Sequence, residues 1–337
     1  TMTLNLRLER EEQLATFSPR SAVINLGLYL PHDVGTVVED LIVIADENRL
    51  RFLNNKGEEI TEQYLDNKIR ELTFTGFQSN GALDGYLMGL ASNSVELIRV
   101  IIRPKKDVDT VRKLKDLEFK TSIHKSYTLG EVKGDQDDPE EHYVKNILSG
   151  TNDNISPLYV STTRGLHVFA EPELDRMNGL HLEFNNRITI DGRTPRLFTT
   201  GYDDIRSRVN GKPRPHQYVL LSGDHELKPL AVQYRIRGGK MRDPIRRTIV
   251  VPSNSTVVIP LFTEHGFAAL DSFGDLWYLP RENGYNTMGD RTLKLTLGNY
   301  GLTGNKKLIP STQKRDERPL VYIQNHTSIV RYRLLER

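Results

Sequence analysis

The residues of this sequence best suited to chemistry are the cations of two basic stretches. The denser stretch, Tyr234–Thr248, reads YRIRGGKMRDPIRRT and holds a single acidic residue, Asp243. The other, SRVNGKPRPH, comes shortly before it. A guanidinium group offers a planar pair of donors to two oxygens of a phosphate or carboxylate, so clustered arginines can bind anions. The candidate binding residues are Arg206, Arg208, Lys212, Arg214, Arg235, Arg237, Lys240, Arg242, Arg246 and Arg247.

These cations also have a simpler interpretation. A hairpin turning at Gly238-Gly239 would carry such charges to face water or to pair with an acidic loop. The most acidic segment, Gly134–Glu141 (GDQDDPEE), does not match a calcium-binding loop, because the sixth position from Asp135 is not Gly and the twelfth is not Glu. We therefore expect this segment to be a solvated loop and not a metal site.

Motifs for other site chemistries are missing from the sequence. It has no cysteine, which excludes disulfides, thiolate metal sites and cysteine nucleophiles. The histidines are dispersed and show no metal-ligand spacing, and no nucleophile elbow, P-loop or dinucleotide fingerprint occurs. We expect no catalytic residue of recognisable type, no cofactor and no metal. Carboxylates gathered from distant parts of the chain would leave no local motif.

Composition indicates a folded protein. The chain has 337 residues, a formal net charge of +2 and 37% hydrophobic residues, so no overall charge marks it as a nucleic-acid binder. No apolar run approaches the roughly 18 residues of a transmembrane helix. Charges at Arg7, Glu9 and Arg10 argue against a secretory signal. The expectation is a cytoplasmic protein, of bacterial type, without a membrane partner.

Strand signals dominate the elements that must position these residues. Short alternating apolar runs are separated by Asn, Asp and Gly clusters, which suit the tight turns of hairpins. Copies of a strand–turn–strand pattern occur at Leu41–Leu53, Tyr86–Val100, Leu158–Phe169, Leu180–Ile190, Val219–Val232, Val258–Leu270 and Val321–Leu334. Helical signals are limited to Leu4–Leu14, Asp107–Leu117 and Asp138–Leu148.

The hairpin pattern predicts an all-β fold, specifically a β-propeller of about six or seven blades with charged loop insertions. Several copies begin at intervals near the roughly 40–50 residues of a blade. Stacking four-stranded sheets around a ring buries both faces of each sheet. We expect residues 1–20 to form an N-terminal tail or short helix and residues 21–337 a single propeller domain. Strand Ala22–Leu30 is expected to share a blade with Leu320–Leu334 and so close the ring.

The segments Leu41–Ile60 (LIVIADENRLRFLNNKGEEI) and Leu158–Gly179 resemble blade hairpins of quinoprotein and WD40 propellers. Gly266–Pro280 (GFAALDSFGDLWYLP) has a similar pattern. The resemblance is to a fold and carries no functional residues across. The Trp-Asp signature of WD40 blades is missing, since Trp277 is the only tryptophan and Tyr278 follows it. We expect these two aromatic residues in the blade core or at its rim.

Three functions remain open. The leading hypothesis is a non-enzymatic scaffold that recognises a protein or peptide partner within a larger assembly, with contacts in the charged segments 101–150, 203–217 and 235–248. The first alternative is a nucleic-acid-binding propeller that uses basic loops 206–214 and 235–247. The second is a hydrolase or lyase with a carboxylate and histidine site in the central funnel.

Overall fold

The computed structural model describes residues 6–32, 35–79, 82–92, 94–128, 144–149, 158–162, 165–169, 187–188, 195–203, 214–221, 230–237, 240–252, 254–261, 266–279, 293–302, 304, 306–315 and 318–336. Across these ranges the regular structure is β-strand, apart from two 3₁₀ turns, η1 (Leu114–Asp116) and η3 (Leu297–Tyr300). The all-β prediction is confirmed.

The described strands form antiparallel four-stranded sheets, which we number along the chain. Sheet 1 contains β2 (Ala22–Asn25), β5 (Ile42–Asp46), β6 (Arg49–Leu53) and β7 (Glu59–Tyr64); sheet 2 contains β8 (Glu71–Ser79), β9 (Ala82–Leu90), β10 (Ser94–Pro104) and β11 (Leu117–Thr128); sheet 3 contains β12 (Val144–Ser149), β13 (Leu158–Thr162), β14 (Gly165–Phe169) and β15 (Arg187–Ile188). A separate hairpin, β3 (Leu28–His32) and β4 (Gly35–Glu39), lies between β2 and β5 in the chain.

The second half of the chain continues this arrangement. Sheet 4 contains β16 (Pro195–Asp203), β17 (Arg214–Leu221), β18 (Leu230–Arg237) and β19 (Lys240–Val250); sheet 5 contains β20 (Ser255–Pro260), β21 (Phe267–Asp271), β22 (Asp275–Leu279) and β23 (Leu293–Thr296); sheet 6 contains β24 (Lys307–Arg315), β25 (Arg318–Gln324), β26 (Ser328–Glu336) and, at its outer edge, β1 (Leu6–Thr16).

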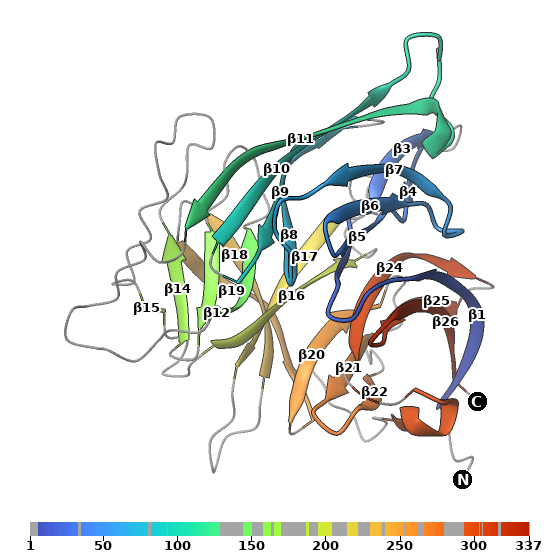
Figure 1. The fold of residues 1–337 in the computed structure, drawn as a ribbon. Helices are drawn as coiled ribbons and strands as arrows, with labels where there is room; N and C mark the ends of the chain where they lie inside the picture. Colours follow the sequence, from blue (N-terminus) through green and yellow to red (C-terminus); the bar gives the residue numbers. More distant parts are fainter. Residues whose placement is uncertain are drawn as a thin grey trace.

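The first strands of the sheets form a closed ring. β2 contacts β8, β8 contacts β12, and the series continues through β16 and β20 to β24, which contacts β2. Each sheet extends outward from this inner ring, so the fold is a β-propeller (Figure 1). This arrangement confirms the fold that the hairpin pattern predicts.

Most of the predicted hairpins form where the pattern places them. The copy at Leu41–Leu53 becomes β5 and β6, and the copy at Val321–Leu334 becomes β25 and β26. The copy at Leu180–Ile190 lies outside the described residues except for β15. Buried strands such as Ile42–Asp46 are apolar along nearly their whole length, because both faces of the sheet are covered.

The helix expected over Leu4–Leu14 and the tail expected over residues 1–20 are wrong, because this segment contains strand β1. β1 pairs with β26 from Leu6↔Glu336 to Thr16↔Ser328 and completes sheet 6, in place of the predicted partner strand Ala22–Leu30. Its charges occupy strand positions because arginines face them across the pair: Arg333 donates to Glu9 over 2.8 Å. The strand β12 likewise replaces the end of the helix expected at Asp138–Leu148, whose residues 138–143 lie outside the described ranges.

Arg331 of β26 joins the last sheet to the first. Its Nε lies 3.1 Å from Glu11 Oε2 and its second guanidinium nitrogen lies 3.3 Å from Glu12 Oε2, both on β1. The same side chain donates to the carbonyl oxygen of Asn55 in the β6–β7 turn of sheet 1. Arg331 is buried, so it is the kind of paired charge whose partners cannot be removed without leaving an unsatisfied ion.

A buried carboxylate, Asp40, also links sheet 1 to sheet 6. Its Oδ2 accepts hydrogen bonds from Ser311 Oγ (2.7 Å) and from the hydroxyl of Tyr322, both in sheet 6. Its Oδ1 accepts one from Asn25 of β2 over 2.8 Å, and Asn25 also donates to the carbonyl of Pro310. Burial and the neighbouring Asp40 raise the pKa of Tyr322 well above its usual value, which keeps the hydroxyl protonated as a donor.

A glycine allows the two ends of the ring to approach. Gly57 in the β6–β7 turn has a φ of +78°, and a Cβ placed there would lie 2.2 Å from the carbonyl oxygen of Leu14 in β1. Gly301 has a similar φ of +72° but faces open space. The two positions therefore separate the cost of backbone conformation from the cost of crowding.

We expect Gly57→Ala to destabilise the protein by more than about 3 kcal/mol, because it combines the left-handed penalty with displacement of β1. Gly301→Ala should cost only about 1 kcal/mol, the conformational part alone. Urea denaturation of both variants measures the difference. Equal losses of stability would show that close approach of β1 to this turn does not matter.

Candidate binding surfaces

The hairpin of β10 and β11 extends past its sheet as an arm, which we define as residues 103–120. Its apolar residues Val111, Leu114 and Leu117 are buried in the core shared by sheets 1 and 2. The ring of Phe119 lies 6.4 Å from that of Phe52 in sheet 1, and the adjoining Thr121 donates to Gln63 of β7 over 3.0 Å. β11, which carries the end of the arm, contacts β7, and Figure 1 shows the arm running beside that strand. The arm is therefore a fixed part of the fold.

The arm's backbone is held by local hydrogen bonds. Lys105 N–H donates to the carbonyl of Asp116, and the Asp116 carboxylate accepts from the N–H groups of Arg112 and Lys113, all at 3.0 Å. These donors, Arg112 first, hold the pKa of Asp116 below its usual value. The helix expected over Asp107–Leu117 is accordingly wrong: only the turn η1 forms, because burial of Val111 and Leu114 against the core decides the path.

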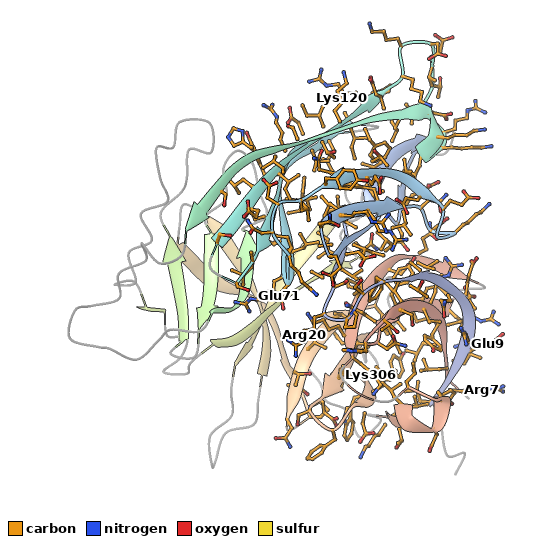
Figure 2. The ribbon with its side chains drawn as sticks, in the orientation of Figure 1. Arg7, Glu9, Arg20, Glu71, Lys120 and Lys306 are labelled. Carbon is orange, nitrogen blue, oxygen red and sulfur yellow. The ribbon has the colours of Figure 1, made fainter. Side chains whose placement is uncertain are left out.

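The arm presents several exposed cations, two of which, Lys113 and Lys115, lie near enough to the Asp116 carboxylate to help lower its pKa. Arg103, Lys105, Lys106, Lys113 and Lys115 are all exposed, and none forms an ion pair with any residue in the described part of the chain. Lys120, labelled in Figure 2, does have a partner, Glu118, at 3.5 Å. Acidic side chains at Asp107 and Asp109 interrupt the series. The sequence alone predicted a short helix within the charged segment 101–150, and the fixed spacing of the cations emerges from the packing.

The candidate cations of the basic stretches converge only in part. Arg206, Arg208 and Lys212 lie outside the described residues. Arg214, Arg235, Arg237, Lys240, Arg242, Arg246 and Arg247 lie on strands β17, β18 and β19 of sheet 4. Segment 235–248, expected as a loop insertion, is mostly strand, because β18 runs to Arg237 and β19 pairs with it from Lys240 onward.

Strand register places several of these residues at one end of sheet 4. Arg214 pairs with Asp203 where β17 begins, and Arg237 pairs with Lys240 where β18 passes to β19. Since β16 and β18 run in the same direction, both turns lie at the same end of the sheet, where Arg235 and Arg242 are also paired. Arg246 and Arg247 lie farther along β19. Of the first basic stretch only Arg214 is described, and the register puts it at the same end of sheet 4 as Arg235, Arg237, Lys240 and Arg242.

The opposite ends of the strands carry the segments that join one sheet to the next, and we call this the connection side. Segment 17–21 is held from both neighbouring sheets: Asp46 of sheet 1 accepts from Ser18 N–H over 2.9 Å, and Gln324 of sheet 6 donates to the carbonyl of Ser21 over 2.7 Å. Segment 65–70 is held similarly, since Asn67 donates to Glu96 of sheet 2 over 2.6 Å. The polar side chains of Asp46, Gln324 and Glu96 therefore hold the connecting segments against the sheets.

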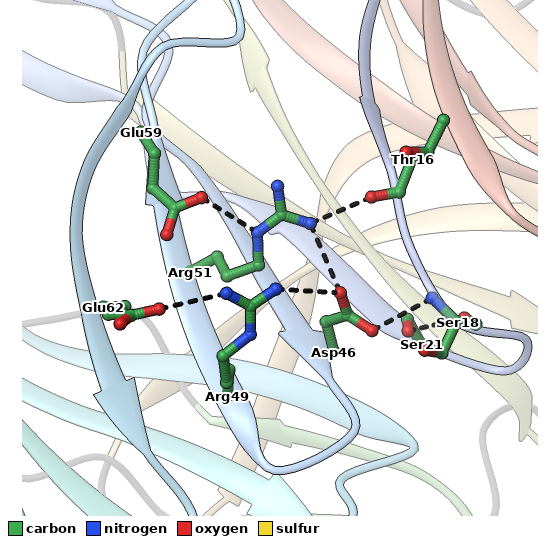
Figure 3. Close-up of polar contacts among 8 residues, drawn as sticks. All are labelled: Thr16, Ser18, Ser21, Asp46, Arg49, Arg51, Glu59 and Glu62. Carbon is green, nitrogen blue, oxygen red and sulfur yellow. Dashed lines mark hydrogen bonds and ion pairs between the residues drawn. The ribbon is translucent and has the colours of Figure 1, made fainter.

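Asp46 is the centre of an ion network on this side (Figure 3). Its Oδ2 lies 3.3 Å from Arg51 and 3.7 Å from Arg49, while Arg51 also contacts Glu59 and donates to the carbonyl of Thr16 at the end of β1. Burial opposes ionisation of Asp46, but the Ser18 donor and the two guanidinium groups outweigh it, so the pKa of Asp46 is lowered. A carboxylate held ionised in this way stabilises the fold and is not poised to accept a proton near neutral pH.

Among the residues that the structure describes, no group of three or more His, Asp or Glu side chains is placed to hold a metal ion. The same residues include no helix long and apolar enough to cross a bilayer.

Comparison with known proteins finds likeness at the level of structure. No family model matches the sequence, and no curated protein matches it. Among solved structures, the β-propeller domain of Cps50 (Swd1) from Myceliophteria thermophila is 10% identical, with 98% of this chain and 99% of that chain covered and a TM-score of 0.45. The WD40 domain of SCAP from fission yeast gives 10% identity, coverage of 97% and 98%, and a TM-score of 0.41. BBS1N in complex with ARL6DN gives 12% identity, coverage of 97% and 95%, and a TM-score of 0.42.

Asp46→Asn should lower stability by about 2 kcal/mol at pH 7, because charge-assisted bonds to the Asp46 carboxylate are weakened. The folded-state pKa is depressed, so this contribution is present above the unfolded value of about 3.9 and is lost as pH falls through the folded value. The difference in free energy of unfolding between wild type and Asp46→Asn should therefore narrow below about pH 4. Denaturant unfolding across pH measures it, with the exposed Asp66→Asn as control. A gap that stays constant down to about pH 3 would refute the assignment.

Proposed function

We propose that this chain is a binding propeller that recognises a protein partner through its arm and serves as a scaffold or subunit in a larger assembly. The observation that carries the proposal is a set of exposed cations, Arg103, Lys105, Lys106, Lys113 and Lys115, that form no ion pair among the described residues and lie on an arm fixed by buried apolar residues. We further propose that the ring has six blades, the six sheets of the described residues, in one domain that includes β1 as well as residues 21–337. A cytoplasmic location stays a prediction.

The rigidity of the arm supports binding. Flexible lysines on a mobile loop lose conformational freedom when a partner orders them. In the arm, the buried side chains of Val111, Leu114 and Leu117 and the bonds around Asp116 have already fixed the backbone. Only the side chains remain to be ordered, so more of the attraction to a partner's carboxylates becomes affinity.

The charge pattern of the arm favours a protein over a nucleic acid. A nucleic-acid backbone is uniformly negative, so Asp107, Asp109 and Glu118 would face phosphates unfavourably. A protein surface can place carboxylates opposite Lys105 and Lys106 and a cation opposite Asp107. Such matching contributes more to specificity and association rate than to affinity alone.

Reversing the charge of three arm lysines should weaken this recognition. We expect Lys105→Glu/Lys106→Glu/Lys113→Glu to weaken the partner's binding at least about tenfold, chiefly because association becomes slower. The affinity of this variant should also depend less on salt than that of wild type. The control Arg7→Glu/Arg20→Glu/Lys56→Glu makes the same change in net charge at exposed positions elsewhere.

The partner is first recovered from the source organism with the tagged full chain, washed at low and high salt, and then purified for titration against both variants. Loss of affinity in the arm variant alone supports the proposal. Equal affinity of the arm variant and wild type, or equal losses in both triple variants, would overturn it.

A nucleic-acid-binding function is the second candidate, favoured by one observation. β16 ends and β17 begins at the end of sheet 4 where β18 ends and β19 begins, so Arg214 of one basic stretch lies at the same end as Arg235 and Arg237 of the other. This end of sheet 4 corresponds to the end of sheet 2 that carries the arm. In both sheets it is the end where the first strand leads to the second and the third strand leads to the fourth.

Under this alternative, fluorescent duplex DNA and single-stranded RNA should bind with an affinity that falls steeply with salt. Arg235→Ala/Arg237→Ala/Arg246→Ala/Arg247→Ala should then reduce the salt slope and weaken binding regardless of sequence. Fluorescence anisotropy at several salt concentrations measures both quantities. Unchanged affinity in the fourfold variant would eliminate the nucleic-acid function.

A further inference from the structure

One large apolar side chain stands exposed at a turn of sheet 5. Phe273, between β21 and β22, is 78% exposed. The neighbouring aromatic residues of the same hairpin behave differently: Tyr278 is buried in the core, and the indole of Trp277 is partly covered. Exposed aromatic residues held in a fixed position are typical anchors of protein interfaces.

The turn that carries Phe273 is rigidly built. The buried carboxylate of Asp271 accepts three hydrogen bonds, each 2.9 Å long, from Phe273 N–H, Asp275 N–H and the Trp277 indole. Gly274 supplies a φ of +82°, which an L-residue would adopt only with strain. Ser272 N–H donates to the carbonyl of Asn254, which ties the turn to the segment before β20. Phe273 is thus projected into solvent from a fixed base.

Cations surround the base of this turn. Lys306 Nζ lies 3.3 Å from the position that a Cβ on Gly274 would take, and it donates to the carbonyl of Gly304. Burial lowers the pKa of Lys306, an effect that the carboxylate of Asp275 opposes. Lys294 Nζ lies 3.1 Å from Asp275 and 5.5 Å from the centre of the Trp277 ring. Lys294 therefore has an acidic partner in the structure, whereas Lys306 has no ion pair among the described residues.

The turn lies on the connection side. Ser272 contacts the segment that joins sheet 4 to sheet 5, and Gly274 contacts the segment that joins sheet 5 to sheet 6. The arm lies on the opposite side. In sheet 2 the β9–β10 turn is on the connection side, since Arg70 N–H of segment 65–70 donates to the carbonyl of Leu90. The arm joins β10 to β11 at the other end of β10. In Figure 2, Lys120 on the arm and Lys306 beside sheet 5 lie in separate parts of the molecule.

We propose that Phe273 anchors a second protein partner, a folded protein whose apolar pocket receives the ring and whose carboxylates meet Lys306 at the pocket edge. The site is on the opposite side of the propeller from the arm, so the chain can hold two partners at once. This goes beyond the proposed function and does not depend on it, since the observations at sheet 5 involve no residue of the arm.

A photoreactive phenylalanine analogue at position 273 of the full chain, in cells of the source organism, tests the proposal. The matched control carries the analogue at Tyr64, another exposed aromatic position at 62% exposure. A protein crosslinked from position 273 and not from position 64 is then purified. Its affinity is measured for wild type, Phe273→Ala, Phe273→Leu, Lys306→Glu and the triple arm variant.

We expect Phe273→Ala to weaken binding about thirtyfold and Phe273→Leu to weaken it less, because leucine still fills part of a pocket. Lys306→Glu should weaken binding further as salt is lowered, and the arm variant should bind normally. The melting temperature of Phe273→Ala should match wild type, since the side chain is exposed. Identical adducts from both positions, adducts between copies of this chain, or unchanged affinity in Phe273→Ala would each overturn the proposal. Weakened binding in the arm variant would overturn the assignment to two separate sites.

Discussion

Pairing between the two ends of the chain is the constraint on which the rest of this structure depends. β1 supplies the outer strand of the sheet that β24, β25 and β26 begin, so the last sheet is complete only when the chain returns to its start. Without β1, the edge of β26 would be open to solvent and to other chains. The contacts of Arg331 and Asp40 extend this pairing to sheet 1, so that closure is fixed by buried ion pairs and hydrogen bonds as well as by strand register.

Ring closure also determines where the candidate surfaces lie. The arm packs on sheet 1 through Phe119 and Phe52, and sheet 1 is positioned against sheet 6 by Gly57 and the Asp40 cluster. The Phe273 turn rests between segments that lead into and out of sheet 5. Each surface therefore depends on neighbouring sheets as well as on the hydrogen bonds of its own hairpin, since an isolated hairpin is marginally stable in water.

The sequence predicts what is local and misses what is distant. Hairpins such as β5–β6 follow from alternation and turn residues within a dozen or so positions, and they form as expected. The pairing of β1 with β26 joins residues more than 300 positions apart. The charges of Glu9 and Glu11 argue against a strand in the sequence alone, because their partners Arg333 and Arg331 lie at the other end of the chain. The helix predicted over Asp107–Leu117 is wrong for the same reason. The cations of the arm are evident in the sequence, but the burial of Val111 and Leu114 that fixes their spacing depends on sheet 1.

The treatment of charge across the molecule supports a binding function. Where an arginine serves the fold, the chain provides it with carboxylates: Arg51 meets Asp46 and Glu59, and Arg331 meets Glu11 and Glu12. Among the described residues, Lys105 and Lys106 of the arm have no such partner, although acidic residues occur nearby in sequence. Like charges gathered without partners repel one another and do not stabilise the folded chain. Their position on a rigid element supports the proposal that they meet the counter-charges of another molecule.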